Sequence, residues 1–304
     1  MTPRTPRASG RVTVVIITHN RRAELLCTLE HLLALPDRAP VVVVDNGSTD
    51  GTADAVKHHV GPVRLLRSAT NLGALGRNLA VQGIDTRYVA FCDDDTWWAP
   101  YALTRAADLL DSHPGLASVT ARILVGPQQI EDPITPELRH SPVPGPPWLP
   151  GPALLGVLAG ASMFRATAFR EVGGFSPRLW LGGEEELLAL DLAARGWWMC
   201  WEPETVVHHY PSRSRDPRRR RQLGIRNTLW TAWLRRPVPG AVRRTRALLR
   251  SIPLDWTTVT AVVEALGGLR WVLRERQVIP AEVERGLRSL EEPQRRSPAR
   301  RYIG

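Results

Sequence analysis

Phe91-Cys92-Asp93-Asp94-Asp95-Thr96-Trp97-Trp98 is the stretch that decides the organisation of this chain. It joins an apolar run, Tyr88–Cys92, which reads as a buried strand, to three adjacent carboxylates. Neighbouring carboxylates at a strand end repel one another, so a cation or hydrogen-bond donors must offset the repulsion. Bound Mg²⁺ or Mn²⁺ would do so, because these ions prefer oxygen ligands and commonly lie between carboxylates and the phosphates of a substrate. The alternative is an acidic turn in which Asp95 or Thr96 caps the next helix.

Three other apolar runs precede this strand, and polar residues follow each of them. The runs are Val12–Thr18, Val41–Val44 and Val63–Leu66. Helical periodicity separates them, and alternating strands and helices predict a mostly parallel sheet flanked by helices. The polar segments that end the four strands are Thr18–Arg21, Asp45–Asp50, Asn71–Asn78 and Asp93–Asp95. Because ligands bind at the carboxyl edge of such a sheet, we expect the functional site there.

The composition describes a globular chain with a basic surface. Its 304 residues are 43% hydrophobic, enough for one α/β domain with an appendage. Its three cysteines lie far apart and form no Cys-x-x-Cys pair, which argues against a disulfide framework or a zinc site and fits a reducing cytoplasm. Residues 1–10 read as a disordered tail, and no apolar window is long enough to span a membrane. The net charge of +10 is concentrated after Arg213 and would attract nucleic acid, an anionic membrane face or a phosphorylated substrate.

The run from Val12 to Pro100 resembles the donor half of the inverting glycosyltransferases of family 2, which have the GT-A, Rossmann-like fold and use nucleotide-sugars. The resemblance rests on four pieces in order: Thr18-His19-Asn20-Arg21, Val44–Thr52, Asn71–Asn78, and the Asp-x-Asp formed by Asp93 and Asp95. It implies that Asp95 binds the metal directly, that Asp93 faces both the metal and the ribose, and that the donor is a UDP- or dTDP-sugar. The residues that it places at the nucleotide-sugar are Thr18, Asn20, Arg21, Asp45, Asn71, Gly73, Arg77, Asp93 and Asp94.

A second acidic cluster, Glu184–Glu186, follows two glycines and begins a predicted helix. Acidic residues at a helix N-terminus are stabilised by the helix dipole, so a structural role is one interpretation. In the resembling family this place reads Gly-Glu-Asp, and its second acidic residue is the general base. The resemblance implies that Glu185 is the catalytic base and that Glu184 contacts the acceptor, although this chain has Glu where the family commonly has Asp. The choice among the three glutamates stays open.

Two predicted strands, Trp197–Trp201 and Thr205–His209, follow this helix. Histidines at a strand end are most often ordinary polar residues. In the resembling family, a histidine at this place can complete the metal site or approach the diphosphate. The resemblance therefore implies that His208 is a metal ligand, with His209 as the second choice.

Two further segments lie outside this framework. Residues 126–152 are rich in proline with little periodicity and are predicted to form a flap on the acceptor side, with Trp148 either stacked on a sugar or packed within the protein. Residues 212–304 are predicted to form a basic extension, with helices near 226–234, 241–251, 257–274 and 280–290. Its basic face is either solvated or docked on an anionic membrane, where lipid-linked acceptors lie.

Together these features predict an α/β protein with a GT-A-like domain over 11–211 and a basic helical C-terminal extension over 212–304. The predicted reaction is metal-dependent, inverting transfer of a hexosyl or deoxyhexosyl group from a nucleotide-diphosphate sugar to a hydroxyl of a glycan or lipid-linked acceptor. We expect it to serve cell-envelope glycan synthesis, in the cytoplasm or on the inner face of the membrane.

Two alternatives belong to other classes of protein. A sugar nucleotidyltransferase would share a nucleotide-binding α/β sheet, but Thr18–Arg21 lacks the glycines of its usual phosphate loop. A nucleic-acid-binding protein would explain the arginines, but Asp93–Asp95 and Glu184–Glu186 would repel nucleic acid.

Overall fold

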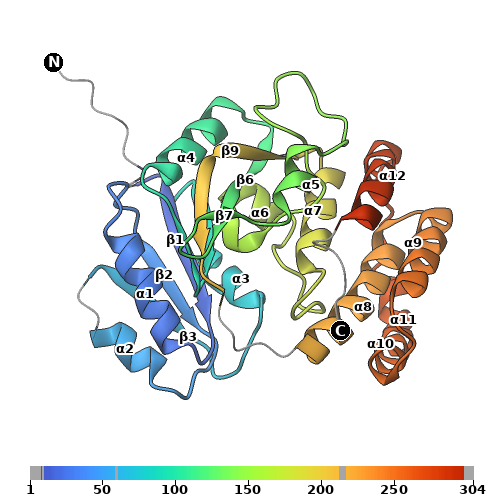
Figure 1. The fold of residues 1–304 in the computed structure, drawn as a ribbon, viewed down its shortest axis with the longest axis horizontal. Helices are drawn as coiled ribbons and strands as arrows, with labels where there is room; N and C mark the ends of the chain where they lie inside the picture. The colour runs from blue at the N-terminus through green and yellow to red at the C-terminus, as the bar shows by residue number, and fades with distance from the viewer. Residues whose placement is uncertain (1–7, 9, 59–60, 212–216, 298–304) are drawn as a thin grey trace.

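The computed structural model describes residues 8, 10–58, 61–211 and 217–297. A curled sheet runs through the molecule, and helices cover both of its faces (Figure 1). Within the described residues the strand order is β3-β2-β1-β4-β8-β6-β9-β5, with β7 paired to β6. The strands are β1 (Val12–Thr18), β2 (Val41–Asp45), β3 (Val63–Arg67), β4 (Tyr88–Asp93), β5 (Thr96–Trp98), β6 (Leu116–Val125), β7 (Ile130–Glu131), β8 (Ser162–Arg165) and β9 (Trp198–His209).

The first half of the sheet is parallel, as the alternating pattern predicts. Strands β3, β2, β1 and β4 pair in parallel. The apolar residues of β2 and β4 and most of those of β1 are buried, whereas those of the edge strand β3 are half-buried. Thr18 is in register with Asp45, and Ile17 is in register with Asp93. The polar segments therefore meet at one edge of the sheet. The helices that connect these strands are α1 (Arg22–Leu33), α2 (Thr52–His58) and α3 (Leu75–Gln82).

The second half of the sheet is mixed. Strand β8 is antiparallel to β4 and β6, whereas β9 is parallel to β6 and antiparallel to β5. The two strands expected over 197–209 form the single strand β9, and a bulge interrupts its pairing with β6 between Ala121 and Arg122. Glu202 lies at this irregularity, and its carboxylate accepts the backbone N–H of Thr205 at 2.5 Å.

Four phenylalanines fill the core on one side of β4. Phe91 on β4 lies 5.4 Å from Phe169 and 5.5 Å from Phe164, measured between ring centroids, and Phe175 lies 5.6 Å from Phe169. Such tilted and edge-to-face pairs add to the free energy gained by burial. This core supports the loops that leave β4 and precede α7. The helical elements of this half are α4 (Ala102–Ser112), α5 (Thr135–Arg139), η1 (Ala159–Ala161), α6 (Ala166–Glu171) and α7 (Glu184–Ala194).

Five helices follow residue 216 and gather beside α7 (Figure 1). They are α8 (Pro217–Arg235), α9 (Val238–Ser251), α10 (Trp256–Gly267), α11 (Leu269–Arg274) and α12 (Ala281–Arg296). The helix expected over 257–274 is divided at Gly268, which packs against Trp230. Val283 and Leu287 of α12 belong to the same hydrophobic core as Leu155, so this core extends from the sheet to α12. The domain boundary predicted at 211/212 adjoins residues outside the described part of the chain.

Within the part of the chain that the structure describes, no helix is both long enough and apolar enough to cross a membrane.

Candidate active site

One cavity of about 1180 Å³ opens at the carboxyl edge of the parallel strands. The aspartate triplet lies on one side of it, the glutamate cluster at the start of α7 lies on another, and helices α5, α8 and α12 complete the wall. The sequence-predicted residues that line it are Thr18, Asn20, Arg21, Asn71, Gly73, Arg77, Asp93, Asp94, Asp95, Glu184, Glu185 and Glu186. The fold thus brings together acidic clusters about ninety residues apart in the sequence.

Two arginines pair with the aspartate triplet. Nη1 of Arg21 lies 3.0 Å from Asp94 Oδ1 and 3.2 Å from Asp95 Oδ2, and Arg77 pairs with Asp93. The hydroxyl of Thr18 donates to the second oxygen of Asp94 at 2.9 Å. Burial raises the pKa of Asp94 to about 7, Arg21 opposes this rise, and the neighbouring Asp93 and Asp95 add to it. An additional cation bound at the triplet would therefore be electrostatically favourable.

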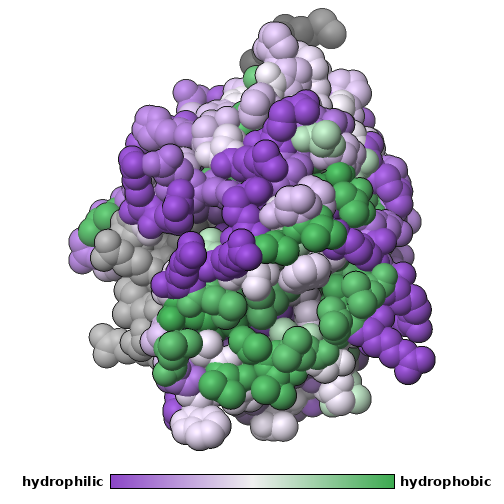
Figure 2. All heavy atoms as spheres, turned by 90° about the vertical axis from the view of Figure 1, so that its right-hand side faces the viewer, coloured by the Kyte–Doolittle hydropathy of each residue, from purple (hydrophilic) through white to green (hydrophobic). Residues whose placement is uncertain are grey.

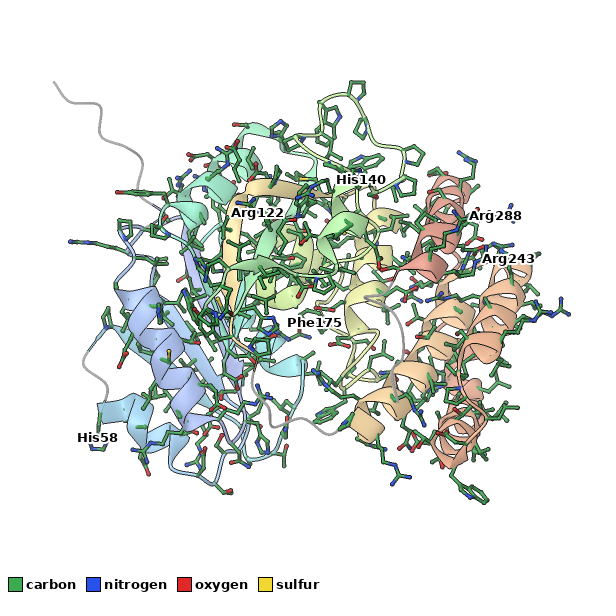
Figure 3. The ribbon with its side chains drawn as sticks, viewed as in Figure 1. His58, Arg122, His140, Phe175, Arg243 and Arg288 are labelled. Carbon is green, nitrogen blue, oxygen red and sulfur yellow. The ribbon has the colours of Figure 1, made fainter. Side chains whose placement is uncertain are left out.

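Arg77 is held rigidly at the floor of the cavity. Its side chain is buried, and its guanidinium lies 5.7 Å from the ring centroid of Phe91 and 5.6 Å from that of Phe175. Phe175 is labelled near the middle of the molecule in Figure 3. A planar guanidinium fixed between aromatic rings and a carboxylate is suited to bind an anionic group. Burial raises the pKa of Glu184 and Glu185, and the positive charge of Arg77 partly opposes this rise.

His209, and not His208, faces the triplet. Nε2 of His209 lies 3.7 Å from Asp95 Oδ1. His208 precedes it on β9 and points the other way, because side chains alternate along a strand, and its ring lies 5.8 Å from that of Trp97. Burial, with a smaller contribution from His31, lowers the pKa of His208. Of the two histidines, His209, the second choice from the sequence, therefore lies nearer to Asp95, and a metal-binding role for either histidine stays a prediction.

The donor atoms at this edge fit Mg²⁺ or Mn²⁺. The carboxylates of Asp93 and Asp95 offer hard oxygens, which these ions prefer, and His209 adds one ring nitrogen beside Asp95. In the described residues no three His, Cys, Asp or Glu side chains are already grouped as a metal site. Arg21 and Arg77 hold the carboxylates in this arrangement. Asp93 and Asp95 remain the residues that could hold the ion.

Asn20 and Asp45 differ in how they relate to the cavity. Asn20 lines it with a left-handed backbone, φ 53°, and its side-chain oxygen accepts the N–H of Thr49 at 2.8 Å. Asp45 is fully buried, accepts the N–H of Ser48 at 2.9 Å and lies 3.3 Å from Nε of Arg67. Among the described residues, Asn46 and not Asp45 contributes to the cavity wall. The Asp45 side chain instead closes the turn after β2, and its contact with a nucleotide stays a prediction.

Gly73 allows Trp180 to approach the donor edge. Gly73 has φ +58°, and an added Cβ would lie 2.2 Å from the carbonyl oxygen of Trp180. The indole N–H of Trp180 donates to the carbonyl of Asn71 at 2.9 Å, and the side-chain oxygen of Asn71 accepts the N–H of Gly73 at 2.9 Å. Trp180 therefore connects the segment before α7 to the loop before α3, a role that the sequence did not indicate.

Among the glutamates at the start of α7, which line the cavity, Glu184 is buried and Glu185 and Glu186 are half-buried. Glu185 accepts the backbone N–H of Ala159, and desolvation with the neighbouring Glu184 raises the pKa of Glu185 to about 8. Glu184 is only 5% exposed, and burial raises its pKa as well. Its Oε2 is a buried atom without a hydrogen-bond partner among the described residues. Two adjacent carboxyls of raised pKa inside a cavity are candidates for proton transfer.

Two residues that position these groups were missed by sequence reasoning. Gly160 lies against Asp93, since an added Cβ would be 2.7 Å from Asp93 Oδ2. Asn227 of α8 is fully buried and donates from Nδ2 to the carbonyls of Leu181 and Gly182, so it fixes the turn that begins α7. For the contact between Asn227 and the turn before α7, the only signal in the sequence was an asparagine on an apolar helix face.

The predicted flap contributes only in part. Ile134, Leu138 and Ser141 line the cavity, and Leu138 lies on α5. Trp148 instead stacks on His113, with 6.1 Å between ring centroids, and does not belong to the described lining. Of the two interpretations of Trp148, this geometry favours packing within the protein.

Arginines of the C-terminal helices line the far wall of the cavity. Among the described residues they are Arg219, Arg220, Arg221 and Arg244, together with Arg236 between α8 and α9. Three of these arginines are paired with acidic residues. Arg221 pairs with Asp255, and Arg219 lies 3.6 Å from Glu264. Arg236 pairs with Glu284 and Glu291. Figure 3 labels Arg243 and Arg288, from α9 and α12, which both lie within ion-pair distance of Glu284. This part of the cavity wall therefore carries several arginines, three of which are paired with acidic residues.

Comparisons with known proteins identify the family and the fold. Residues 13–173 match the sequence model of glycosyl transferase family 2. The chain is 29% identical over 247 residues to the N-acetylglucosaminyl-diphospho-decaprenol L-rhamnosyltransferase of Mycobacterium tuberculosis, covering 67% of this chain and 78% of the relative. The fold is similar to a mannosyltransferase of Pyrobaculum calidifontis solved with GDP-Man and Mn²⁺, at TM-score 0.57, 19% identity and coverage of 94% of this chain and 89% of that chain. It is also similar to GalNAc-T7 solved with UDP, GalNAc and Mn²⁺, at TM-score 0.60, 15% identity and coverage of 87% and 56%.

The fold and the cavity therefore define a glycosyltransferase with the GT-A fold. The chain belongs to glycosyl transferase family 2. This assignment confirms the predicted resemblance and fold class, and it favours glycosyl transfer over the nucleotidyltransferase and nucleic-acid alternatives.

Proposed function

We propose that this protein is a metal-dependent, inverting glycosyltransferase that moves a sugar from a nucleotide-diphosphate sugar to a hydroxyl of a lipid-linked acceptor in cell-envelope glycan synthesis. One observation carries the proposal: Asp93–Asp95 and Glu184–Glu186 line the same cavity from different sides. A donor held at the aspartates would present its anomeric carbon toward the glutamates. An acceptor entering beside α7 would then meet a base on the side away from the diphosphate.

The donor side is proposed to bind a UDP- or dTDP-sugar. Thr18, Asn20 and Arg21 would lie along the nucleoside, and Arg77 would approach the ribose or the diphosphate, for which its fixed guanidinium is suited. A bound Mg²⁺ or Mn²⁺ would supply positive charge that stabilises the leaving diphosphate. Asp93 and Asp95 would hold that ion, with His209 beside Asp95. The structural relatives solved with nucleotide and Mn²⁺ support this view.

The proposed base is Glu185. It would accept the proton of the acceptor hydroxyl as that oxygen attacks the anomeric carbon from the face opposite the leaving group, so no covalent intermediate is required. The N–H of Ala159 orients the carboxylate. With a pKa of about 8, Glu185 is a stronger base than an ordinary carboxylate once it is ionised. Glu184, one residue earlier, would contact acceptor hydroxyls.

The far wall supports an acceptor that carries phosphate. Arg219, Arg221 and Arg244 line the same cavity as the aspartates, and they would supply positive charge to a diphosphate between a sugar and a lipid. The mycobacterial relative is named for an acceptor of this kind, a sugar joined through a diphosphate to decaprenol. We therefore propose a prenyl-diphosphate-linked sugar as the acceptor class.

A thermal-shift panel would test the donor assignment. UDP-, GDP- and dTDP-sugars are added with and without Mn²⁺, and the matching donor is expected to stabilise the protein by roughly 2.7 kcal/mol at about 100 times its dissociation constant. Transfer from that donor to a synthetic prenyl-diphosphate sugar, and the anomeric configuration of the product, then test the rest. No Mn²⁺-dependent stabilisation by any nucleotide-sugar would contradict the donor site, and retained anomeric configuration would contradict the role of Glu185.

A further inference from the structure

An apolar stripe covers the exposed face of α10 and α11. We define the α10–α11 stripe as Leu254, Trp256, Val259, Val263, Leu266, Leu269 and Leu273, all of which are exposed. Leu254 and Trp256 are 90% and 82% exposed, and Val263 and Leu266 are 62% and 64% exposed. Figure 2 shows hydrophobic side chains gathered over the lower part of this face. The largest exposed side chains of an ordinary surface helix are polar, so this pattern is unusual.

The opposite face of the same helices is already used for packing. Thr258, Ala261, Ala265 and Val272 are buried, and the indole N–H of Trp230 on α8 donates to the carbonyl of Ala265 at 2.9 Å. The helices are thus anchored to α8 through small residues. The large apolar residues point away from the protein, and within the described chain nothing covers them.

Basic residues border the stripe. Arg246 and Arg250 on α9, and Arg270 on the helix of the stripe itself, are exposed, and none has an ion-pair partner among the described residues. The acidic residues nearby are paired with arginines of α8. Asp255 pairs with Arg221, and Glu264 lies 3.3 Å from Arg226. The face therefore combines exposed apolar groups with a net positive border.

The stripe begins beside the cavity. Asp255 lies between Leu254 and Trp256, and it pairs with Arg221, which lines the cavity wall. The side chain of Asp255 also caps α10 by accepting the N–H of Thr258 at 2.9 Å. Asp255 therefore connects the N-terminal end of the α10–α11 stripe to Arg221 of the cavity wall.

We propose that the α10–α11 stripe inserts into the interfacial region of an anionic lipid bilayer and holds the cavity at the membrane surface. Apolar side chains on one helix face enter the boundary between headgroups and acyl chains, and arginines at the border pair with anionic headgroups. A second copy of this chain is the poorer occupant, since two such faces would bring their arginine borders together. The inference does not depend on the identity of the donor or the acceptor.

Vesicle flotation of the full chain tests this assignment. The double variant Val263→Asp/Leu266→Asp removes apolar groups from the stripe, and Tyr101→Asp/Ile130→Asp is its matched control. The control residues are 64% and 65% exposed, lie outside the stripe and introduce the same charge. We expect wild type and control to float with phosphatidylcholine–phosphatidylglycerol vesicles, and the stripe variant to bind at least about tenfold more weakly. Binding to pure phosphatidylcholine should be weaker for all three proteins.

A second readout reports the depth of insertion. Lipids brominated on the acyl chains quench a tryptophan that enters the bilayer, so vesicle-induced quenching should fall in Trp256→Phe while flotation persists. Equal flotation of the stripe variant and the control would overturn the proposal, as would quenching that does not depend on Trp256. Absence of flotation, together with a dimer in solution that the stripe variant abolishes, would assign the stripe to a second copy instead. Circular dichroism of both double variants verifies that they are folded.

Discussion

Gly160 lies directly against Asp93, so that a Cβ added at Gly160 would be 2.7 Å from Asp93 Oδ2. The preceding residue, Ala159, donates its N–H to Glu185. The carbonyl of Gly160 in turn accepts the hydroxyl of Thr96 at 3.1 Å. One short segment, η1, therefore contacts both acidic clusters of the cavity, and the distance between the proposed metal-binding and base residues depends on it.

Replacing Gly160 by alanine should disturb both clusters at once. The added methyl group must displace Asp93 or η1, and a displacement of about 1 Å at a reacting centre can lower the rate by roughly 10²-fold. We expect kcat/KM of Gly160→Ala to fall by about 10- to 100-fold with little change in Tm. Gly267→Ala is the control, because an added Cβ there meets no atom within 4 Å. Equal activity of the two variants would show that η1 does not position the carboxylates.

The two histidines at the end of β9 provide a matched pair for the metal proposal. His209→Gln should weaken Mn²⁺-dependent binding of nucleotide by roughly 10- to 100-fold, because the residue beside Asp95 is changed. His208→Gln should leave this binding intact, since His208 lies against Trp97. Asp95→Asn should remove the dependence on Mn²⁺ altogether. Calorimetric titration of UDP or dTDP with and without Mn²⁺ measures all three, and an effect confined to His208→Gln would reverse the assignment.

Much of the donor half follows from local patterns in the sequence. The valine-rich runs of β1 and β2 can only be strands buried on both faces, and parallel pairing then brings Thr18, Asp45 and Asp93 to one edge. The identity of the residues at that edge was thus predictable from the order of the elements.

Contacts that depend on side-chain direction or on distant elements were not predictable in the same way. The choice between His208 and His209 depends on the register of β9 against β5, in which Thr96 pairs with His209. Asp45 Oδ1 accepts the N–H of Ser48 and its Oδ2 lies 3.3 Å from Nε of Arg67, and the second of these contacts joins different strands. The bond from Asn227 to Gly182 joins residues 45 positions apart.

The raised pKa values predict how stability depends on pH. Asp94 and Glu185 have pKa values of about 7 and about 8 in the folded protein, compared with ordinary values of 3.8 and 4.5. The folded state therefore binds more protons than the unfolded state across this range, so the free energy of unfolding should decrease as pH rises from about 4 to about 8. In Glu185→Gln, the free energy of unfolding should fall less over this pH range, by on the order of 1–3 kcal/mol. Chemical denaturation at pH 5 and pH 8 measures it, with Glu30→Gln, an exposed change on α1, as the control.

The glutamates of α7 allow the proposed base to be separated from an acceptor-binding residue. Glu185→Gln keeps the shape of the side chain but cannot accept the proton, so kcat should fall by on the order of 10²–10⁴ while donor affinity stays nearly unchanged. In wild type, kcat should rise with pH as Glu185 ionises near its pKa of about 8, and this rise should be absent from the residual activity of the variant. Glu184→Gln should act mainly through the KM of the acceptor. Near-normal turnover of Glu185→Gln with an inactive Glu184→Gln or Glu186→Gln would move the base along the helix, and activity in all three variants would place the base outside α7.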